Sequence, residues 1–206
     1  TQKNSCDSTV KNGLLLQKMK GMSVVAPPDS FDKSCMVHLK NLGADWIAVL
    51  PFAYFSVEKP IIQSFSGGWW GERPEGIRHT IHLAHFKGIQ FMLKPQLWNR
   101  HLWIGTLNFA SEKDRNLFHL SYTKFILEWV KLVADRGVEL FCIGTELWNS
   151  SNKYTEFWKS LILKIKKVYT GKLTYTSNWD NYNRIQFWDA LDYIGTDAYF
   201  SLSSRA

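Results

Sequence analysis

The sequence predicts an α/β fold in which buried parallel strands alternate with helices, and two features of the chain support this class. First, four helix-like stretches end in glycine and lead at once into an apolar run, at Gly43, Gly88, Gly137 and Gly171. Glycine after a helix is the expected left-handed cap. Second, the apolar runs are short and do not alternate with polar residues, which is typical of strands buried on both faces. Strands that alternate with helices form parallel βαβ units.

Six strands and five helices follow from this pattern. The expected strands cover residues 22–26, 46–52, 90–95, 140–146, 172–177 and 193–199, and the expected helices cover residues 32–42, 74–87, 115–136, 154–169 and 184–191. Pro74 suits a first helical turn. The third helix carries apolar residues from Phe118 to Val133 at three- and four-residue steps, which predicts a face buried against the sheet. We expect an irregular N-terminal segment at residues 1–19 and one domain over residues 20–206.

The composition limits the class of protein. Hydrophobic residues make up 45% of the 206 residues, enough for one sizeable core but not for two full domains. No apolar run approaches the ~20 residues of a membrane span, so none is expected. The net charge of +7 favours a solvated basic surface over nucleic-acid binding, because no nucleic-acid motif accompanies the lysines.

The cellular compartment depends on what precedes the chain, which begins at Thr1 rather than at methionine. A removed leader would make the protein secreted or periplasmic, and otherwise we expect it in the cytoplasm. Cys6 and Cys35 could form a disulfide in an exported protein, and the sequence leaves this open. Cys142 lies inside an apolar strand and is expected to be an inert core thiol.

Polar and aromatic residues gather where the expected strands end. In parallel α/β folds the ligand lies at the carboxyl ends of the strands, so these residues should share one rim. They are Lys94, Gln96, Trp98, Glu146, Asn178, Trp179, Asp197 and Tyr199. Trp70, in a long loop after the second strand, is expected to wall the same cleft. Hydroxyl-binding polar groups beside flat aromatic faces predict a cleft for an oligo- or polysaccharide.

Glu146 is the candidate catalytic residue, because an apolar strand delivers its carboxyl group to the rim. A glycosidase needs a carboxylic acid whose raised pKa allows it to protonate the leaving oxygen. The alternative is a structural glutamate paired with Lys94 across the rim. Each other candidate also has a structural alternative: a rim salt bridge for Lys94, packing for the tryptophans and a hydrogen bond to a neighbouring strand for Asp197.

Several motifs together resemble glycoside hydrolase family 113. They are CIGTEL at residues 142–147, FW at 157–158, YTGKLTY at 169–175, NWD at 178–180 and FWDALDYIGTDAYF at 187–200, and upstream KGMS at 20–23, AP at 26–27, WWG at 69–71, AH at 84–85 and MLKP at 92–95 with Trp98. The resemblance covers nearly the whole chain from Lys20 onward. It implies a (β/α)8 barrel (TIM barrel) of the retaining glycosidase clan, of which this chain holds about the first six strand–helix units.

The resemblance also implies roles for particular residues. The acid/base of that clan lies at the end of barrel strand four, which maps onto Glu146 here. Thr145 precedes it, as in the resembled family, where the clan usually has asparagine. The nucleophile lies at the end of strand seven, so the resemblance implies that it falls beyond this chain. Gln96 is a departure, because the mannanases are expected to have histidine there. Glutamine can hydrogen-bond a hydroxyl but cannot titrate, which leaves the substrate less certain than the reaction class.

No metal or cofactor is expected. His79, His82 and His85 follow each other at three-residue steps on a helix, so the outer two diverge around the helix axis, and no HExxH motif is present. His85 matches a position of the family and is expected to be packed.

The predicted function is that of a retaining endo-glycoside hydrolase acting on β-1,4-mannan or a related β-glycan, with Glu146 as general acid/base. The alternative is a carbohydrate-binding protein that does not hydrolyse its ligand, because the nucleophile is missing from the chain. An incomplete barrel would also expose two sheet edges, through which self-association is possible.

Overall fold

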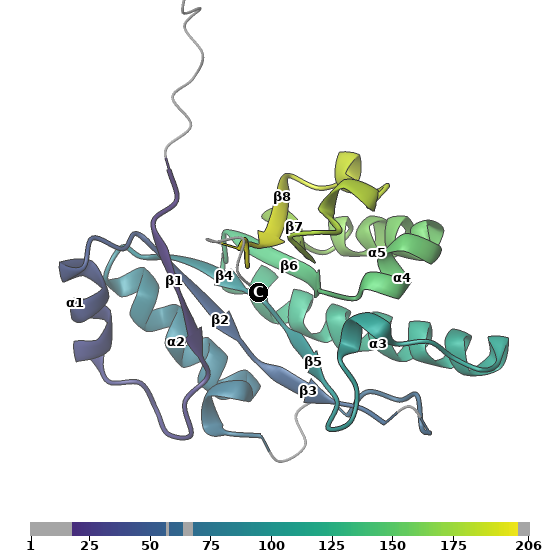
Figure 1. The fold of residues 1–206 in the computed structure, drawn as a ribbon. Coiled ribbons are helices and arrows are strands. Elements are labelled where there is room, and N and C mark those ends of the chain that lie inside the picture. The colour runs from purple at the N-terminus through teal and green to yellow at the C-terminus, as the bar shows by residue number, and fades with distance from the viewer. Residues whose placement is uncertain (1–17, 57, 64–67, 202–206) are drawn as a thin grey trace, which may run out of the picture.

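The computed structural model describes residues 18–56, 58–63 and 68–201, and these form one six-stranded parallel sheet. The strands, in the order in which they lie side by side, are β1 (Gly21–Val25), β2 (Trp46–Leu50), β4 (Gln90–Leu93), β6 (Leu140–Thr145), β7 (Lys172–Asn178) and β8 (Tyr193–Asp197). Every neighbouring pair is parallel, and the strands fan into a half-barrel (Figure 1). The six predicted strands are therefore confirmed. The predicted segment 1–19 lies outside the described residues, apart from residues 18 and 19, and so does Cys6.

Helices connect the strands as the glycine pattern predicted. They are α1 (Lys33–Asn41), α2 (Pro74–Phe86), α3 (Glu112–Ala134), α4 (Trp148–Lys153) and α5 (Thr155–Lys166). Gly43, Gly88 and Gly137 follow α1, α2 and α3 with φ between 62° and 80°, which confirms the left-handed caps. Gly171 is not left-handed, because α5 ends at Lys166 and the glycine lies too far beyond it to cap the helix.

Three expected elements differ from the structure. The second and third expected strands stop early, and the chain resumes after Pro51 and Pro95 as short strands β3 (Phe52–Tyr54) and β5 (Gln96–Trp98), which pair with each other. Proline has no N–H to continue the ladder of the main sheet. The helix expected over 184–191 is wrong, since this segment forms two 3-10 turns, η3 (Tyr182–Arg184) and η4 (Trp188–Ala190). Ile185 and Phe187 are both buried, and residues two apart cannot share one face of an α-helix.

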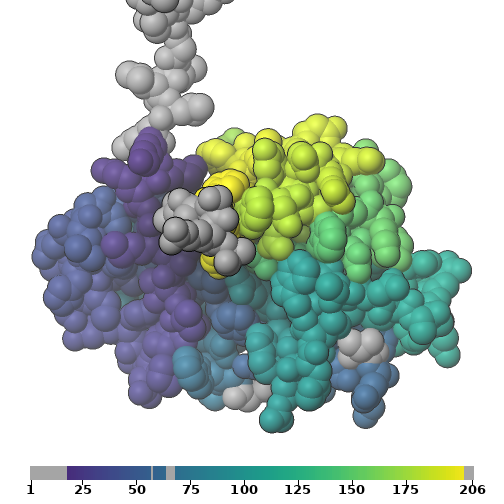
Figure 2. Space-filling view, viewed as in Figure 1, coloured from purple at the N-terminus to yellow at the C-terminus, as the bar shows by residue number. Residues whose placement is uncertain are grey.

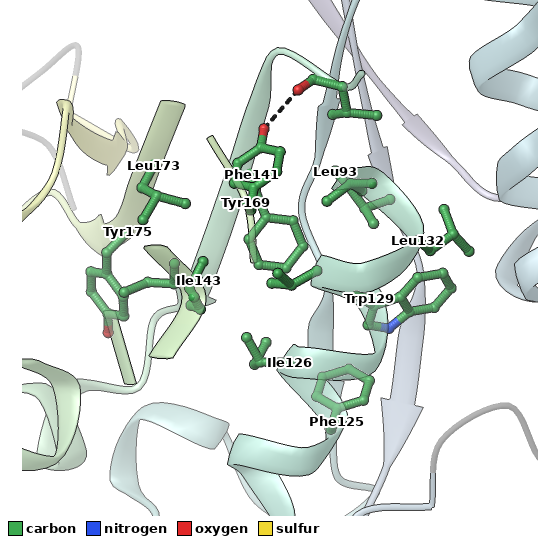
Figure 3. Packing of buried hydrophobic residues seen from close by; sticks show 14 of the residues in the cluster. Leu93, Phe125, Ile126, Trp129, Leu132, Phe141, Ile143, Tyr169, Leu173 and Tyr175 are labelled. Carbon is green, nitrogen blue, oxygen red and sulfur yellow. Dashed lines mark hydrogen bonds between the residues drawn. The ribbon is translucent and has the colours of Figure 1, made fainter. Parts of the chain in front are cut away.

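The core lies between the outer face of the sheet and helices α2, α3 and α5. Figure 3 shows Ile126 and Trp129 of α3 beside Leu93, Phe141 and Ile143 of the sheet. The apolar stripe predicted for the third helix is confirmed, because Phe118, Tyr122, Phe125, Trp129 and Val133 are all buried. Each such side chain contributes about 1.5–3 kcal/mol to the free energy of folding when it is removed from water. Among the described residues, no helix combines the length and the apolar character needed to cross a membrane.

Within residues 18–56, 58–63 and 68–201, both ends of the sheet have an unpaired edge, because β1 pairs only with β2 and β8 pairs only with β7. Val25 on β1 and Ile194 on β8 are more than half exposed. In the space-filling view the purple segment with β1 and the yellow segment with β8 reach the same face of the molecule (Figure 2). Unpaired edges with apolar side chains favour pairing with another chain. Self-association through these edges stays a prediction.

Gly144, two residues before Glu146, leaves no room for a side chain. A Cβ atom there would lie 2.8 Å from Cη2 of Trp158 and 2.9 Å from Oη of Tyr122. We expect Gly144→Ala to lower the free energy of unfolding by about 1–3 kcal/mol, because both rings are fully buried and cannot move freely. Urea unfolding followed by fluorescence measures this loss. The same substitution in a Trp158→Phe background, which lacks Cη2, should cost less, and an equal cost in both backgrounds would contradict the steric explanation.

Candidate active site

A cavity of about 390 Å³ opens at the carboxyl ends of the strands. Six of the predicted site residues line it, and they come from β4, β5, β6, β8 and the turns that follow them. These six are Lys94, Gln96, Trp98, Glu146, Asp197 and Tyr199. The predicted convergence of polar and aromatic residues at one rim is therefore present for these residues. A pocket of this size suits a small ligand or a short stretch of a polymer.

The backbone around Glu146 directs its side chain into the cavity. Cys142 lies opposite Thr174 of β7, whereas Thr145 lies opposite Thr176, so β6 holds one extra residue in a bulge. Glu146 follows with φ of 52°, and among the described residues it is the one non-glycine residue with positive φ. Its N–H donates to the carbonyl oxygen of Thr176 at 2.8 Å, which fixes this left-handed turn. Such a conformation is unfavourable for a residue with a side chain.

Two side chains donate hydrogen bonds to the carboxyl group of Glu146. Trp103 Nε1 donates to Oε2 at 3.3 Å. With its nitrogen facing the glutamate, Asn178 Nδ2 donates to Oε1 at 2.7 Å and to Oε2 at 3.2 Å. This orientation of the amide is assigned from the hydrogen bonds, because the reverse would set oxygen against oxygen. The carboxyl group is thus held at a fixed place in the cavity.

A partly buried ion pair lies beside the glutamate. Lys94 Nζ donates to Asp197 Oδ1 at 2.8 Å, which joins the end of β4 to the end of β8 across the two strands, β6 and β7, that lie between them. Lys94 is only 8% exposed. The structural alternative for Glu146, an ion pair with Lys94, is thus replaced by a pair between Lys94 and Asp197. The carboxyl group of Asp197 also lies near that of Glu146.

The pKa of Glu146 is raised above its ordinary value, chiefly because burial disfavours the charged carboxylate. The hydrogen bond from Trp103 opposes this rise, as do those from Asn178 in its assigned orientation. The negative charge and hydrogen bond of Asp197 reinforce the rise, and the positive charge of Lys94 opposes it. The raised pKa keeps a larger fraction of the carboxyl groups protonated near neutral pH. A protonated carboxyl group in a cleft is able to act as a general acid.

The three other predicted residues lie outside the lining of this cavity. Asn178 stands behind Glu146 as its hydrogen-bond donor. The ring of Trp70 meets His79 of α2 edge-on at 5.4 Å, and the exposed ring of Trp179 meets Phe200 at 5.8 Å. Sugar binding by Trp70 and Trp179 stays a prediction.

Trp103 and Asn99 both line the cavity, although neither was among the predicted site residues. They lie in the loop after β5, just before the 3-10 turn η2 (Ile104–Thr106). Gly105 lies directly beneath the Trp103 ring, and any Cβ atom there would overlap the indole. A tryptophan near a glycine in the loop after barrel strand three is the signal that could have indicated Trp103.

The three histidines of α2 have separate partners. His79 Nε2 lies 3.2 Å from the carbonyl oxygen of Phe31, and His85 Nε2 lies 3.3 Å from Oε2 of Glu139. The ring of His82 packs near Phe86. Within the part of the chain that the structure describes, no group of three or more His, Cys, Asp or Glu side chains is arranged to hold a metal ion.

Comparison with known proteins decides the family. A family model described as Glycoside Hydrolase Family 113 matches residues 29–205. The chain belongs to glycoside hydrolase family 113. The family and the partial (β/α)8 barrel that the motifs implied are thereby confirmed. A search of curated proteins gives no match.

Solved structures of family 113 have the same fold. A β-mannanase from Alicyclobacillus acidocaldarius, solved in complex with ManMIm, matches with a TM-score of 0.80 and 22% identity over 88% of this chain and 61% of that chain. A second family 113 structure, a β-1,4-mannanase complex, matches with a TM-score of 0.77 and 19% identity over 90% of this chain and 64% of that one. Fungal β-1,4-galactanases are more distant, with a TM-score of 0.56 and 13% identity over 79% of this chain and 54% of theirs. The chain therefore spans less than two thirds of the length of these family 113 mannanases.

Proposed function

We propose that this chain carries most of the active site of a retaining, endo-acting glycoside hydrolase for β-1,4-mannan, with Glu146 as general acid/base. The observation that supports this best is the carboxyl group of Glu146, which lies in the cavity with a raised pKa and two side-chain donors. Mannan is the first substrate to test because two structures of the same family are described as mannanases.

The proposed reaction has two steps. In the first, Glu146 gives its proton to the glycosidic oxygen as the bond from that oxygen to the anomeric carbon breaks, while a carboxylate nucleophile bonds to that carbon. In the second, the Glu146 carboxylate takes a proton from water, and the water oxygen displaces the nucleophile from the sugar. Lys94, Gln96 and Asp197 are proposed to bind hydroxyl groups.

The proposed nucleophile belongs to a barrel strand beyond β8. Asp197 is a poor candidate for the nucleophile, because Lys94 engages its carboxylate at 2.8 Å. Retaining glycosidases hold their two carboxyl groups about 5–5.5 Å apart. This chain covers 61% and 64% of the two family 113 structures, so more than a third of each has no counterpart here.

Carbohydrate binding without hydrolysis is the second candidate function. Asp197 is the carboxyl group found beside Glu146 in the described structure, and it is already paired with Lys94. The pairing of Asp197 with Lys94 favours a chain that by itself binds a saccharide without hydrolysing it.

The two functions differ in what they release from polysaccharides. We expect the full-length protein that carries this chain to release reducing ends from β-1,4-mannan faster than from β-1,4-xylan or β-1,4-galactan. Proton NMR of the fresh products should show the β-anomer first, because a double displacement retains the configuration. First appearance of the α-anomer would contradict the retaining mechanism. Binding of mannan without any release of reducing ends would favour the second function.

A further inference from the structure

Trp103 places an indole N–H against the carboxyl group of Glu146. Its Nε1 donates to Oε2 at 3.3 Å, although the two residues come from different loops of the rim. The indole also lines the cavity and is 43% exposed, so it is part of the surface that a substrate meets. An indole N–H donates a hydrogen bond but does not titrate, so Trp103 can position a proton-transferring group without exchanging protons itself.

The loop that carries Trp103 is tied to the helix that follows Glu146. Asn149 of α4 donates through Nδ2 to the carbonyl oxygen of Thr106, in the turn η2, at 3.0 Å. The ring of Trp148, the first residue of α4, packs 6.3 Å from the ring of Trp103. Because α4 begins directly after the turn at Glu146, these contacts fix the indole donor relative to its carboxyl acceptor.

The two steps of the proposed reaction need Glu146 in opposite protonation states. In the first step its carboxyl group must hold a proton to give, and in the second it must be charged to take a proton from water. A donated hydrogen bond favours the charged carboxylate. Burial raises the pKa of Glu146, and the hydrogen bond from Trp103 lowers it. The indole therefore favours the form of Glu146 that the second step needs.

We propose that Trp103 is a positioning residue of the second step, in which its indole N–H holds the carboxylate of Glu146 as the base that takes a proton from water. The proposal rests on the proposed function. In this step the water oxygen bonds to the anomeric carbon, the bond from that carbon to the nucleophile breaks, and the water proton passes to Glu146.

The other groups that act on the charge of Glu146 stay in place when only Trp103 changes. Asp197 on β8 raises the pKa of Glu146, and Lys94 at the end of β4 lowers it. Tyr175 on β7 also interacts with Glu146, and its phenol is neutral because burial raises its own pKa above the ordinary value. Trp103→Phe keeps an aromatic ring in the loop and removes the N–H, so it tests the hydrogen bond to Glu146.

Rates of the full-length protein at a series of pH values separate the two steps. Trp103→Phe should raise the pKa of Glu146, so the alkaline limb of kcat/KM for β-1,4-mannan should move up by about half a pH unit. With a nitrophenyl mannobioside, whose leaving group needs no proton, the second step should limit kcat, and the acidic limb of kcat should move up equally. Below that limb the variant should be about threefold slower, whereas above it the two rates should be equal. A general loss of structure would instead lower the rate equally at every pH.

Trp188→Phe is the matched control for the loss of an indole N–H. Trp188 Nε1 donates to the carbonyl oxygen of Tyr182 at 2.7 Å, and the residue lies outside the lining of the cavity. Both limbs should stay at their normal pH in this variant. An equal shift in Trp188→Phe would overturn the proposal, because the effect would then not belong to the hydrogen bond with Glu146, and so would unchanged limbs in Trp103→Phe.

Carbon-13 NMR of the glutamate carboxyl groups measures the pKa of Glu146 without any substrate. Its resonance is identified by its loss in Glu146→Gln, and it should titrate about half a pH unit higher in Trp103→Phe than in the unmodified protein. An unchanged or lowered pKa in a protein that hydrolyses mannan would overturn the role of Trp103 and leave the proposed function intact. A raised pKa in a protein that hydrolyses neither substrate would overturn the proposed function and, with it, the part of Trp103 in the second step.

Discussion

Replacing Glu146 with glutamine is expected to lower the turnover of β-1,4-mannan by the full-length protein by about 10²–10⁴-fold, the usual contribution of a general acid/base. Glutamine keeps the size of the side chain and one acceptor oxygen for Trp103 and Asn178, but it has no acidic proton to give to the leaving oxygen. Initial rates of reducing-end release, measured at several mannan concentrations, give the loss in kcat and in kcat/KM separately.

A substrate that needs no proton separates lost chemistry from lost structure. The leaving group of a nitrophenyl mannobioside is nitrophenolate, which is stable without a proton. Glu146→Gln should therefore still form the glycosyl–enzyme bond and release a burst of nitrophenolate before the slow second step. Glu156→Gln is the matched control, because the side chain of Glu156 is 89% exposed on α5. This variant should turn over mannan at the normal rate. Normal mannan turnover by Glu146→Gln would contradict the role of Glu146 as general acid/base.

Replacing Lys94 with methionine is expected to move the alkaline limb of the pH–rate profile to higher pH. The positive charge of Lys94 lowers the pKa of Glu146, so its removal should raise that pKa further. Asp197 would also lose its partner at 2.8 Å, and its negative charge would then act on Glu146 without compensation. Because the acid must be protonated to work, a higher pKa extends activity to higher pH. Profiles of kcat/KM against pH measure the shift.

The same substitution should also destabilise the fold. Asp197 is 22% exposed at its side chain, and leaving this carboxylate without its donor is expected to cost about 1–3 kcal/mol of unfolding free energy. Lys94→Arg, which keeps the charge, should leave the alkaline limb close to its normal pH. A shift of the limb to lower pH in Lys94→Met would contradict the assigned role of the lysine charge.

Much of the fold could be predicted because its signals are local. Gly43, Gly88 and Gly137 mark helix ends, and an apolar run follows each of them as a buried strand. Parallel strands bring their carboxyl ends together, so the placement of Lys94 and Glu146 at one rim followed from the order of the elements alone.

The details that the sequence did not reveal depend on the direction of single side chains. Trp69 and Trp70 are neighbours, yet the ring of Trp69 is more than half exposed, whereas the ring of Trp70 packs on His79. The 3-10 turn η1 (Trp70–Glu72), which is tied to Pro27 by a hydrogen bond from Gly71, separates the directions of the two rings. The role of Trp103 was missed because it lies 43 residues from Glu146 in the chain and meets it only through the folded loop.

The left-handed backbone at position 146 carries a cost in stability. An L-residue in this conformation costs about 1–2 kcal/mol, which glycine would largely avoid, so selection for a durable fold alone would not choose glutamate there. Its presence supports a chemical role for the carboxyl group over a purely architectural one. Related proteins that bind sugars without hydrolysing them would not need glutamate at this position and could have glycine there instead. Such proteins would have a larger free energy of unfolding and would therefore tolerate more destabilising mutations elsewhere.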